Sequence, residues 1–243
     1  MPETPVVLLA RMRSVSPSSP RLVWYGSDGR IELSGRVFDN WVAKASNLLA
    51  EDLDATDGTL VHFGLPAHWK SLALAFACWQ VGAIAVLPGP GSDVEADIVL
   101  SAEPAPGVEP PRFLVCVALG SLAMSWPGEL PADAVDFAAE VRSHGDVYFG
   151  TAVDREDAVL VHEGAAHLTA QDLTHGLHLP EAVSSTGDPV TVLLEPGTPL
   201  RTALAAALAV WRLDGTLVLL DDGVQVTESL LAGERVTSRP GTG

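Results

Sequence analysis

Positive charge is scarce in this sequence of 243 residues. Only 14 residues are Lys or Arg, against 31 Asp or Glu, and the formal net charge is −17. Lys44 and Lys70 are the only two lysines. Proteins that bind DNA, RNA or an anionic membrane surface need clustered Lys and Arg side chains. We therefore expect no nucleic-acid partner and no association with a membrane.

Cysteine is equally rare, and long uninterrupted apolar runs are missing. Cys78 and Cys116 lie far apart, without a CxxC pair, as is usual for buried free thiols in a reducing compartment. The apolar stretches 71–89 and 202–220 are interrupted by glycine or charged residues, so each fits a helix, a turn and a buried strand better than a membrane span. Glu3 stands where a signal peptide carries positive charge. These features predict a cytoplasmic protein.

Apolar residues make up 47% of the chain, enough for a sizeable core, and they are distributed in alternating patterns. A hairpin is predicted over 21–34, where two apolar runs flank Ser27-Asp28-Gly29. Helical patterns cover 35–53, 66–82, 133–145 and 198–215, and buried strands are predicted at 59–65, 83–89, 96–103, 112–119, 158–161, 189–197 and 216–222. The alternation favours a layered α/β fold with mostly parallel sheets flanked by helices. Residues 59–89 form one β-α-β unit, whose two strands we expect to be parallel.

Two groups of polar residues have the composition of a metal site. His162, His167, His175 and His178 fall within seventeen residues, and the last two have helical i, i+3 spacing. No cysteine and no HExxH pattern accompany them, which favours solvent-facing or capping histidines. Asp221-Asp222 closes a strand and suits either Mg²⁺ or a turn, of which the turn is the simpler interpretation. We predict no metal site.

The order of elements in "GRVFDNWVAKASNLLAEDLDATDGTLVHFGLPAHWKSLALAFACWQVGAIAVLPG" and in "PVTVLLEPGTPLRTALAAALAVWRLDGTLVLL" resembles the N-terminal region of the adenylate-forming, or AMP-binding, superfamily. That group includes acyl-CoA synthetases, luciferases and the adenylation domains of peptide synthetases. The similarity covers roughly residues 22–90 and 155–237 and rests on element order and apolar pattern.

The resemblance implies a single truncated N-terminal domain over 1–243, with two lobes at about 1–150 and 151–243 as the alternative organisation, and a flexible tail at 238–243. The family's motifs for adenine, ribose and Mg²⁺, and its small C-terminal domain with the catalytic lysine, would lie beyond residue 243.

The stretch "DREDAVLVHEGAAHLTAQDL", residues 154–173, departs from that family. The family's phosphate loop is rich in Ser, Thr and Gly, ends in Pro-Lys-Gly, and lies between a strand that corresponds to 158–161 and a helix that corresponds to "LTAQDL". Here the intervening "HEGAAH" has one glycine, no hydroxyl side chain and no lysine, and Glu163 would repel phosphate. The resemblance implies ATP or AMP with Mg²⁺ as cofactors, and this shortened loop argues against them.

The first functional hypothesis is a degenerate adenylate-forming domain that is not an enzyme and binds a small ligand or a protein partner. No catalytic residue is predicted. A surviving pocket is expected where parallel strands end, at His162, Glu163, Gly164, Glu195 and Gly197. The alternatives are an acyl- or nucleotide-binding subunit of a split adenylate-forming ligase, and a self-associating structural protein that forms a homodimer.

Overall fold

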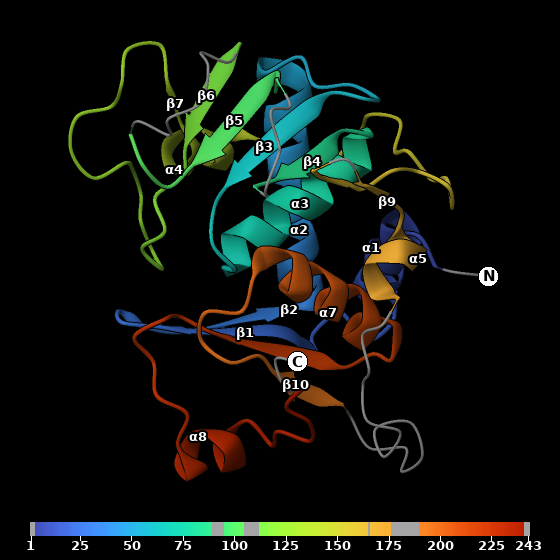
Figure 1. The fold of residues 1–243 in the computed structure, drawn as a ribbon, viewed down its shortest axis with the longest axis vertical. Helices are drawn as coiled ribbons and strands as arrows, with labels where there is room; N and C mark the ends of the chain where they lie inside the picture. Colours follow the sequence, from blue (N-terminus) through green and yellow to red (C-terminus); the bar gives the residue numbers. More distant parts are fainter. Residues whose placement is uncertain (1–2, 89–94, 105–111, 165, 176–189, 241–243) are drawn as a thin grey trace.

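The computed structural model describes residues 3–88, 95–104, 112–164, 166–175 and 190–240, which form two sheets with helices between them (Figure 1). The first sheet has the order β10-β11-β1-β2, and its strands are β1 (Pro20–Gly26), β2 (Gly29–Ser34), β10 (Thr191–Leu193) and β11 (Thr216–Leu220). The second has the order β7-β6-β5-β3-β4-β8-β9, from β3 (Leu60–Gly64), β4 (Ile84–Leu87), β5 (Ile98–Ser101), β6 (Phe113–Cys116), β7 (Val135–Asp136), β8 (Val161–Glu163) and β9 (Ala166–Leu168). Each sheet contains strands from both sides of residue 150.

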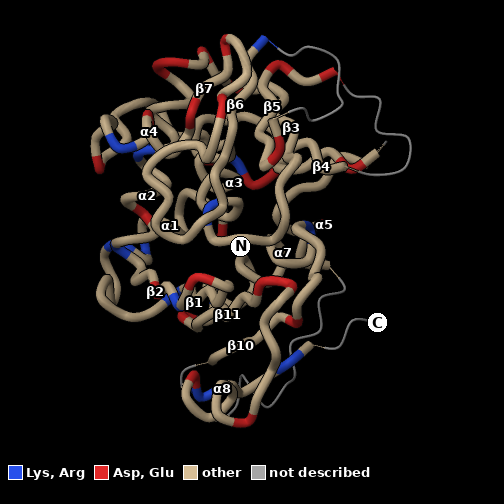
Figure 2. Tube along the Cα trace, turned by 90° about the vertical axis from the view of Figure 1, so that its left-hand side faces the viewer, with Lys and Arg blue, Asp and Glu red and all other residues tan. Residues whose placement is uncertain are grey.

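The longer helices are α1 (Pro5–Ser14), α2 (Gly35–Asn47), α3 (Trp69–Val81) and α7 (Leu200–Arg212), which lie between the sheets in Figure 1. Shorter ones are α4 (Phe137–Glu140), α5 (Ala170–Thr174) and α8 (Glu228–Gly233). Among the described residues, no helix combines the length and the apolar character needed to cross a membrane. Figure 2 shows the Asp and Glu residues spread over both sheets and their loops.

The predicted fold class is confirmed, because most strand pairs are parallel and helices flank the sheets. Among the described strands, only the β1–β2 and β8–β9 pairs are antiparallel. The predicted unit at 59–89 is also confirmed, since β3 and β4 pair in parallel on either side of α3. Gly82 ends α3 with φ +88°, the left-handed conformation that glycine adopts most easily, and the chain passes at once into β4.

Several predicted boundaries are wrong, among them the strand predicted at 189–197, which is observed at Thr191–Leu193, and the three that follow. The helix predicted at 133–145 is interrupted at its start by the short strand β7, because Asp136 caps a single helical turn by accepting hydrogen bonds from the Ala138 and Ala139 amides. The strand predicted at 158–161 begins only at Val161. The helix predicted at 66–82 begins at Trp69, and His68 is its N-terminal cap. In each case a local side-chain hydrogen bond or a tertiary pairing sets the boundary instead of the apolar pattern.

The chain's C-terminal segment returns to the first sheet. Ser238 forms a parallel bridge with Val192 of β10, and the Ser238 carbonyl accepts a hydrogen bond from the Leu193 amide at 3.0 Å. The guanidinium of Arg239 pairs with the Glu195 carboxylate. These two residues belong to the predicted tail at 238–243, of which 241–243 lie outside the described residues.

An aromatic cluster fills the layer between the sheets. The ring of Trp211 on α7 lies 4.8 Å from that of Phe38 on α2 and 5.2 Å from that of Phe76 on α3, measured between ring centroids. Trp211 is fully buried, and its indole N–H donates to the Arg21 carbonyl of β1 at 2.7 Å. One side chain therefore joins three helices and the first sheet.

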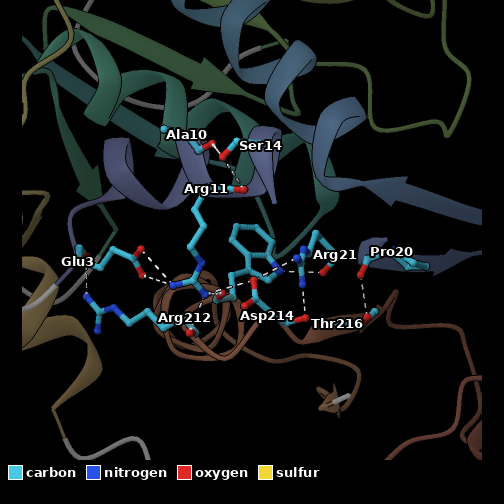
Figure 3. A network of polar contacts seen from close by, with 10 residues as sticks. Glu3, Ala10, Arg11, Ser14, Pro20, Arg21, Arg212, Asp214 and Thr216 are labelled. Carbon is cyan, nitrogen blue, oxygen red and sulfur yellow. Dashed lines mark hydrogen bonds and ion pairs between the residues drawn. The ribbon is translucent and has the colours of Figure 1, made fainter. Parts of the chain in front are cut away.

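Beside this cluster, charged side chains form ion pairs and hydrogen bonds at the C-terminal end of α7, as Figure 3 shows. The buried Arg21 guanidinium lies 3.1 Å from the Asp214 carboxylate. Arg11 of α1 donates to the Trp211 and Arg212 carbonyls at 3.1 and 2.8 Å, which are among the carbonyls that a helix end leaves unpaired. α1, β1 and α7 are thus connected by hydrogen bonds as well as by apolar packing.

Replacing Trp211 by Ala is expected to lower the free energy of unfolding by about 3–5 kcal/mol, because it leaves a cavity at the centre of the helix layer. Leu213→Ala is the matched control at the same helix end, since Leu213 is 43% exposed; its loss should be below about 1 kcal/mol. Urea denaturation followed by circular dichroism measures both. Equal losses for the two variants would contradict the central role of Trp211.

The free energy of unfolding should also depend on pH through the side chain of His68. Its Nδ1 accepts the Lys70 amide proton at 3.1 Å, and burial, assisted by the charge of Lys70, lowers the pKa of His68 to about 3. Below its ordinary pKa of about 6.5 the unfolded chain takes up a proton that the folded chain does not, so stability should fall by about 1.4 kcal/mol per pH unit as the pH drops from 6.5.

His68→Asn is the matched variant, because Asn keeps a capping oxygen and does not titrate. Urea denaturation at several pH values between 7 and 4.5 is expected to show a shallower loss of stability for His68→Asn than for the natural protein. Parallel pH profiles would show that His68 does not carry this dependence.

Candidate functional site

The segment expected to hold a shortened phosphate loop is a β-hairpin. β8 and β9 pair antiparallel, with His162 opposite His167, and β8 also pairs in parallel with β4. The two imidazole rings stack with their centroids 4.0 Å apart. Gly164 makes the turn with φ +58°. Residues 161–163 and 166–168 therefore pair with each other as strands, whereas a phosphate loop turns its backbone N–H groups toward its ligand.

The predicted histidine cluster is not assembled as the helical spacing suggested. α5 begins with a capping box between Thr169 and Asp172 and ends at Thr174, so His175 is its C-terminal cap and not a helical residue. His178 lies outside the described residues. Burial, and after it the neighbouring His167, lower the pKa of His162. Within the part of the chain that the structure describes, no three His, Cys, Asp or Glu side chains converge as ligands of a metal ion.

An ion pair links the hairpin to the start of α7. The Glu163 carboxylate of β8 lies 2.9 Å from the Arg201 guanidinium, in the first turn of α7. α7 follows directly on the loop that contains Glu195 and Gly197. The hairpin and this loop therefore meet at the N-terminal end of α7, beyond the carboxyl ends of β8 and β10.

A cavity of about 320 Å³ opens beside this junction. Its walls come from residues that directly follow the parallel strands β3, β10 and β11, together with the start of α7, the usual place of a ligand in open α/β sheets. Glu195 and Gly197 line it, whereas His162, Glu163 and Gly164 do not. The structure thus brings two of the five predicted residues to a cavity and leaves three in the neighbouring hairpin.

Sequence reasoning missed most of the walls. Pro66 and Ala67, after β3, and Asp221 and Asp222, after β11, line the cavity. The signal was available for the aspartates, which close a predicted strand, but sequence alone did not show that β3, β10 and β11 end side by side in space.

The charges of the cavity are mainly negative. The Glu195 carboxylate is paired with Arg239, but Asp221 and Asp222 are exposed. Gly197, with φ +75°, makes the turn between β10 and α7, and the Thr198 hydroxyl donates to the Glu195 carbonyl at 2.6 Å. The remaining walls are mostly Leu, Pro and Ala. Such a site suits a small ligand that has an apolar body and a neutral or positively charged polar group. It disfavours a triphosphate, because the aspartate carboxylates and the phosphates are all negatively charged.

The turn of the hairpin can be tested at Gly164. Gly164→Val is expected to lose about 1–2 kcal/mol of stability, because a residue with a Cβ is strained in the left-handed conformation, whereas Gly164→Asn should lose less. Thermal and urea denaturation measure both variants. If Val and Asn were tolerated equally, the hairpin turn would not have this conformation.

No family model matches the chain. The chain is 34% identical over 150 residues to the "TIGR03089 family protein" of Mycobacterium tuberculosis, and the match covers 57% of this chain and 59% of that protein. The chain therefore spans less than two thirds of this relative's length.

Solved structures show the similarity of fold. The chain is similar to an acyl-CoA synthetase from Brucella canis, with a TM-score of 0.70 and 19% identity over 96% of this chain and 46% of that one. It is also similar to NpsA-ThdA from Klebsiella oxytoca, an artificially fused adenylation–PCP di-domain, with a TM-score of 0.68 and 12% identity over 98% of this chain and 43% of that one. The chain therefore has the α/β fold of the N-terminal domain of adenylate-forming enzymes.

Proposed function

We propose that this chain binds a small ligand in the cavity at the carboxyl ends of β3, β10 and β11, and that it does not adenylate that ligand. The single observation that carries the proposal is the β8–β9 hairpin. It occupies the position where the resemblance to adenylate-forming enzymes implies a phosphate loop, and the carboxylate beside its turn, Glu163, is paired with Arg201.

The chemistry of adenylation explains why this hairpin matters. Forming an acyl adenylate requires backbone N–H groups and cations around the phosphates, because negative charge develops on the departing pyrophosphate. In the hairpin the backbone groups pair between strands, and Arg201, the nearby cation, already faces a carboxylate. A nucleotide at this position would have to displace Glu163.

The two lysines do not replace the missing cation. The Lys44 ammonium is 2.8 Å from the Asp146 carboxylate, and the Lys70 ammonium donates to the carbonyls of Ala118 and Gly120. Both side chains extend from the helices α2 and α3, toward residues of the second sheet's loops. These contacts support a domain that has kept the fold of the adenylate-forming enzymes without their phosphate chemistry.

The cavity itself indicates what kind of ligand fits. Its volume of about 320 Å³ is at the small end of ligand sites. Apolar walls favour an apolar body, and the exposed Asp221 and Asp222 at its edge favour a neutral or cationic polar group. We therefore propose a small apolar molecule with a hydrogen-bond donor or an amine.

Calorimetric titration of the purified chain with ATP, with and without Mg²⁺, and then with AMP is expected to give no heat of binding and no thermal stabilisation. Assays of pyrophosphate release with ATP and carboxylic acids should likewise stay at background. The physical reason is that the hairpin offers phosphate a carboxylate in place of N–H donors.

Glu163→Gln is the matched variant, because it keeps the side-chain size and frees Arg201 from its partner. Binding of ATP by this variant alone would support the role of the Glu163–Arg201 pair in excluding phosphate. Binding of ATP by the natural chain at micromolar strength would contradict the proposal and favour the nucleotide-binding subunit of a split ligase.

A further inference from the structure

Both lysines of the chain line a second cavity, in a different part of the molecule. It has a volume of about 510 Å³ and lies between α2, α3, α4 and the segment 121–124. Trp41, Trp69 and Phe137 form apolar walls, and Leu122 and Met124 belong to the segment that borders it. This volume is typical of sites for small organic ligands.

The charged side chains of this cavity are cationic. Lys44, Lys70 and Arg142 line it, and none of the described residues that line it is Asp or Glu. This is unusual in a chain whose formal net charge is −17. A concave surface with apolar walls and only positive charges attracts an anion that carries an apolar group.

Lys70 is the most enclosed of the three cations, with 3% of its surface exposed. Its ammonium donates to the Ala118 carbonyl at 2.5 Å and the Gly120 carbonyl at 2.8 Å. An ammonium has three N–H donors, so one remains for a further acceptor. Both partners are neutral, and burial lowers the pKa of Lys70 to about 8, with Asp28 opposing the shift. An anion beside it would stabilise its charged form.

The other two cations differ in their partners. Arg142 donates to the Met124 carbonyl at 2.8 Å, a neutral group, so its charge is not neutralised by that contact. Lys44 is paired with Asp146, which does not line the cavity.

The segment 121–124, which borders the cavity, is held in place by hydrogen bonds at its first residue, and its apolar side chains are exposed to solvent. Asp28, in the β1–β2 turn, accepts hydrogen bonds from the amide and the hydroxyl of Ser121, the first at 2.7 Å. Leu122 is 84% and Met124 63% exposed. Exposed apolar side chains beside a largely apolar cavity are typical of a binding site for an apolar group.

We propose that this cavity binds an amphipathic anion, whose apolar body lies between Trp41, Trp69 and Phe137 and whose anionic head meets Lys70. The site is separate from the cavity beside α7 and does not depend on the function proposed for that cavity. Lys70 supplies the donor for the head group, and Arg142 adds positive charge.

The test uses three eight-carbon probes that differ only in the head group: octanoate, octan-1-ol and octylammonium. Calorimetry on the full chain at pH 7, with intrinsic tryptophan fluorescence, to which Trp41 and Trp69 contribute, as a second signal, is expected to show the tightest binding for octanoate and the weakest for octylammonium. Equal affinity for octanoate and octan-1-ol, or no binding of octanoate at millimolar concentration, would overturn the proposal.

Two variants locate the head group. Lys70→Met is expected to weaken octanoate binding about tenfold or more, since hydrogen bonds to charged groups are strong, and to leave octan-1-ol unchanged. Leu122→Asp, at a position that is 84% exposed, should weaken octanoate more than octan-1-ol, because it adds a negative charge as well as removing an apolar contact. Leu122→Asn, which removes the same contact without adding a charge, is its neutral control. Octanoate affinity that stays the same in both charge-changing variants would place the anion elsewhere and contradict the proposal.

A lipid surface is the competing occupant of an exposed apolar rim with nearby cations. Co-sedimentation with vesicles of phosphatidylcholine and phosphatidylserine tests it. Vesicle binding without binding of free octanoate would overturn the small-molecule proposal, whereas octanoate binding without sedimentation would support it.

Discussion

The packing of α2, α3 and α7 between the two sheets is the constraint on which the rest of the structure depends. Trp211 is at its centre, in contact with Phe38 and Phe76 and hydrogen-bonded to the Arg21 carbonyl. Nearly every residue of α3 is buried, as expected for a helix that is covered on all sides. Because this layer fixes the two sheets relative to each other, the strand ends of both sheets meet at defined places, and the cavity beside α7 forms there.

The same layer requires charged groups to be buried at its edge, and their arrangement limits the cost. Removing Arg21 from water is unfavourable and lowers its pKa, and Asp214 opposes this effect. The Trp211 and Arg212 carbonyls at the end of α7 accept hydrogen bonds from Arg11. Breaking one partner of such a network leaves an uncompensated charge, whereas the complete network contributes little net stability. Its main consequence is to define how α1 and β1 meet the end of α7.

The cavity beside α7 and the cavity beside α3 differ in their charged residues. The cavity beside α7 has Asp221 and Asp222 at its edge, and the cavity beside α3 has Lys70 and Arg142 among its lining residues. Between them the β1–β2 turn extends from the first sheet to Ser121, so the wall of the second cavity is anchored by the first sheet. The β8–β9 hairpin meets α7 through the Glu163–Arg201 pair. The charged residues at each cavity thus depend on which strand ends and loops the helix layer brings together.

The sequence by itself determined the α/β class, the β3-α3-β4 unit and the hairpin at 21–34, because apolar periodicity and the turn residues Asp28, Gly29 and Gly82 act locally. It also showed that the segment around Glu163 lacks the residues of a phosphate loop. Only the tertiary structure decided that this segment is a hairpin, since β8 is only three residues long and its pairing with β4 depends on a partner 76 residues away in the chain. It likewise decided that Glu195 and Gly197 line a cavity that His162 does not, and that Lys44 and Lys70 share another. Such convergence depends on the packing of distant elements, which no local pattern in the chain records.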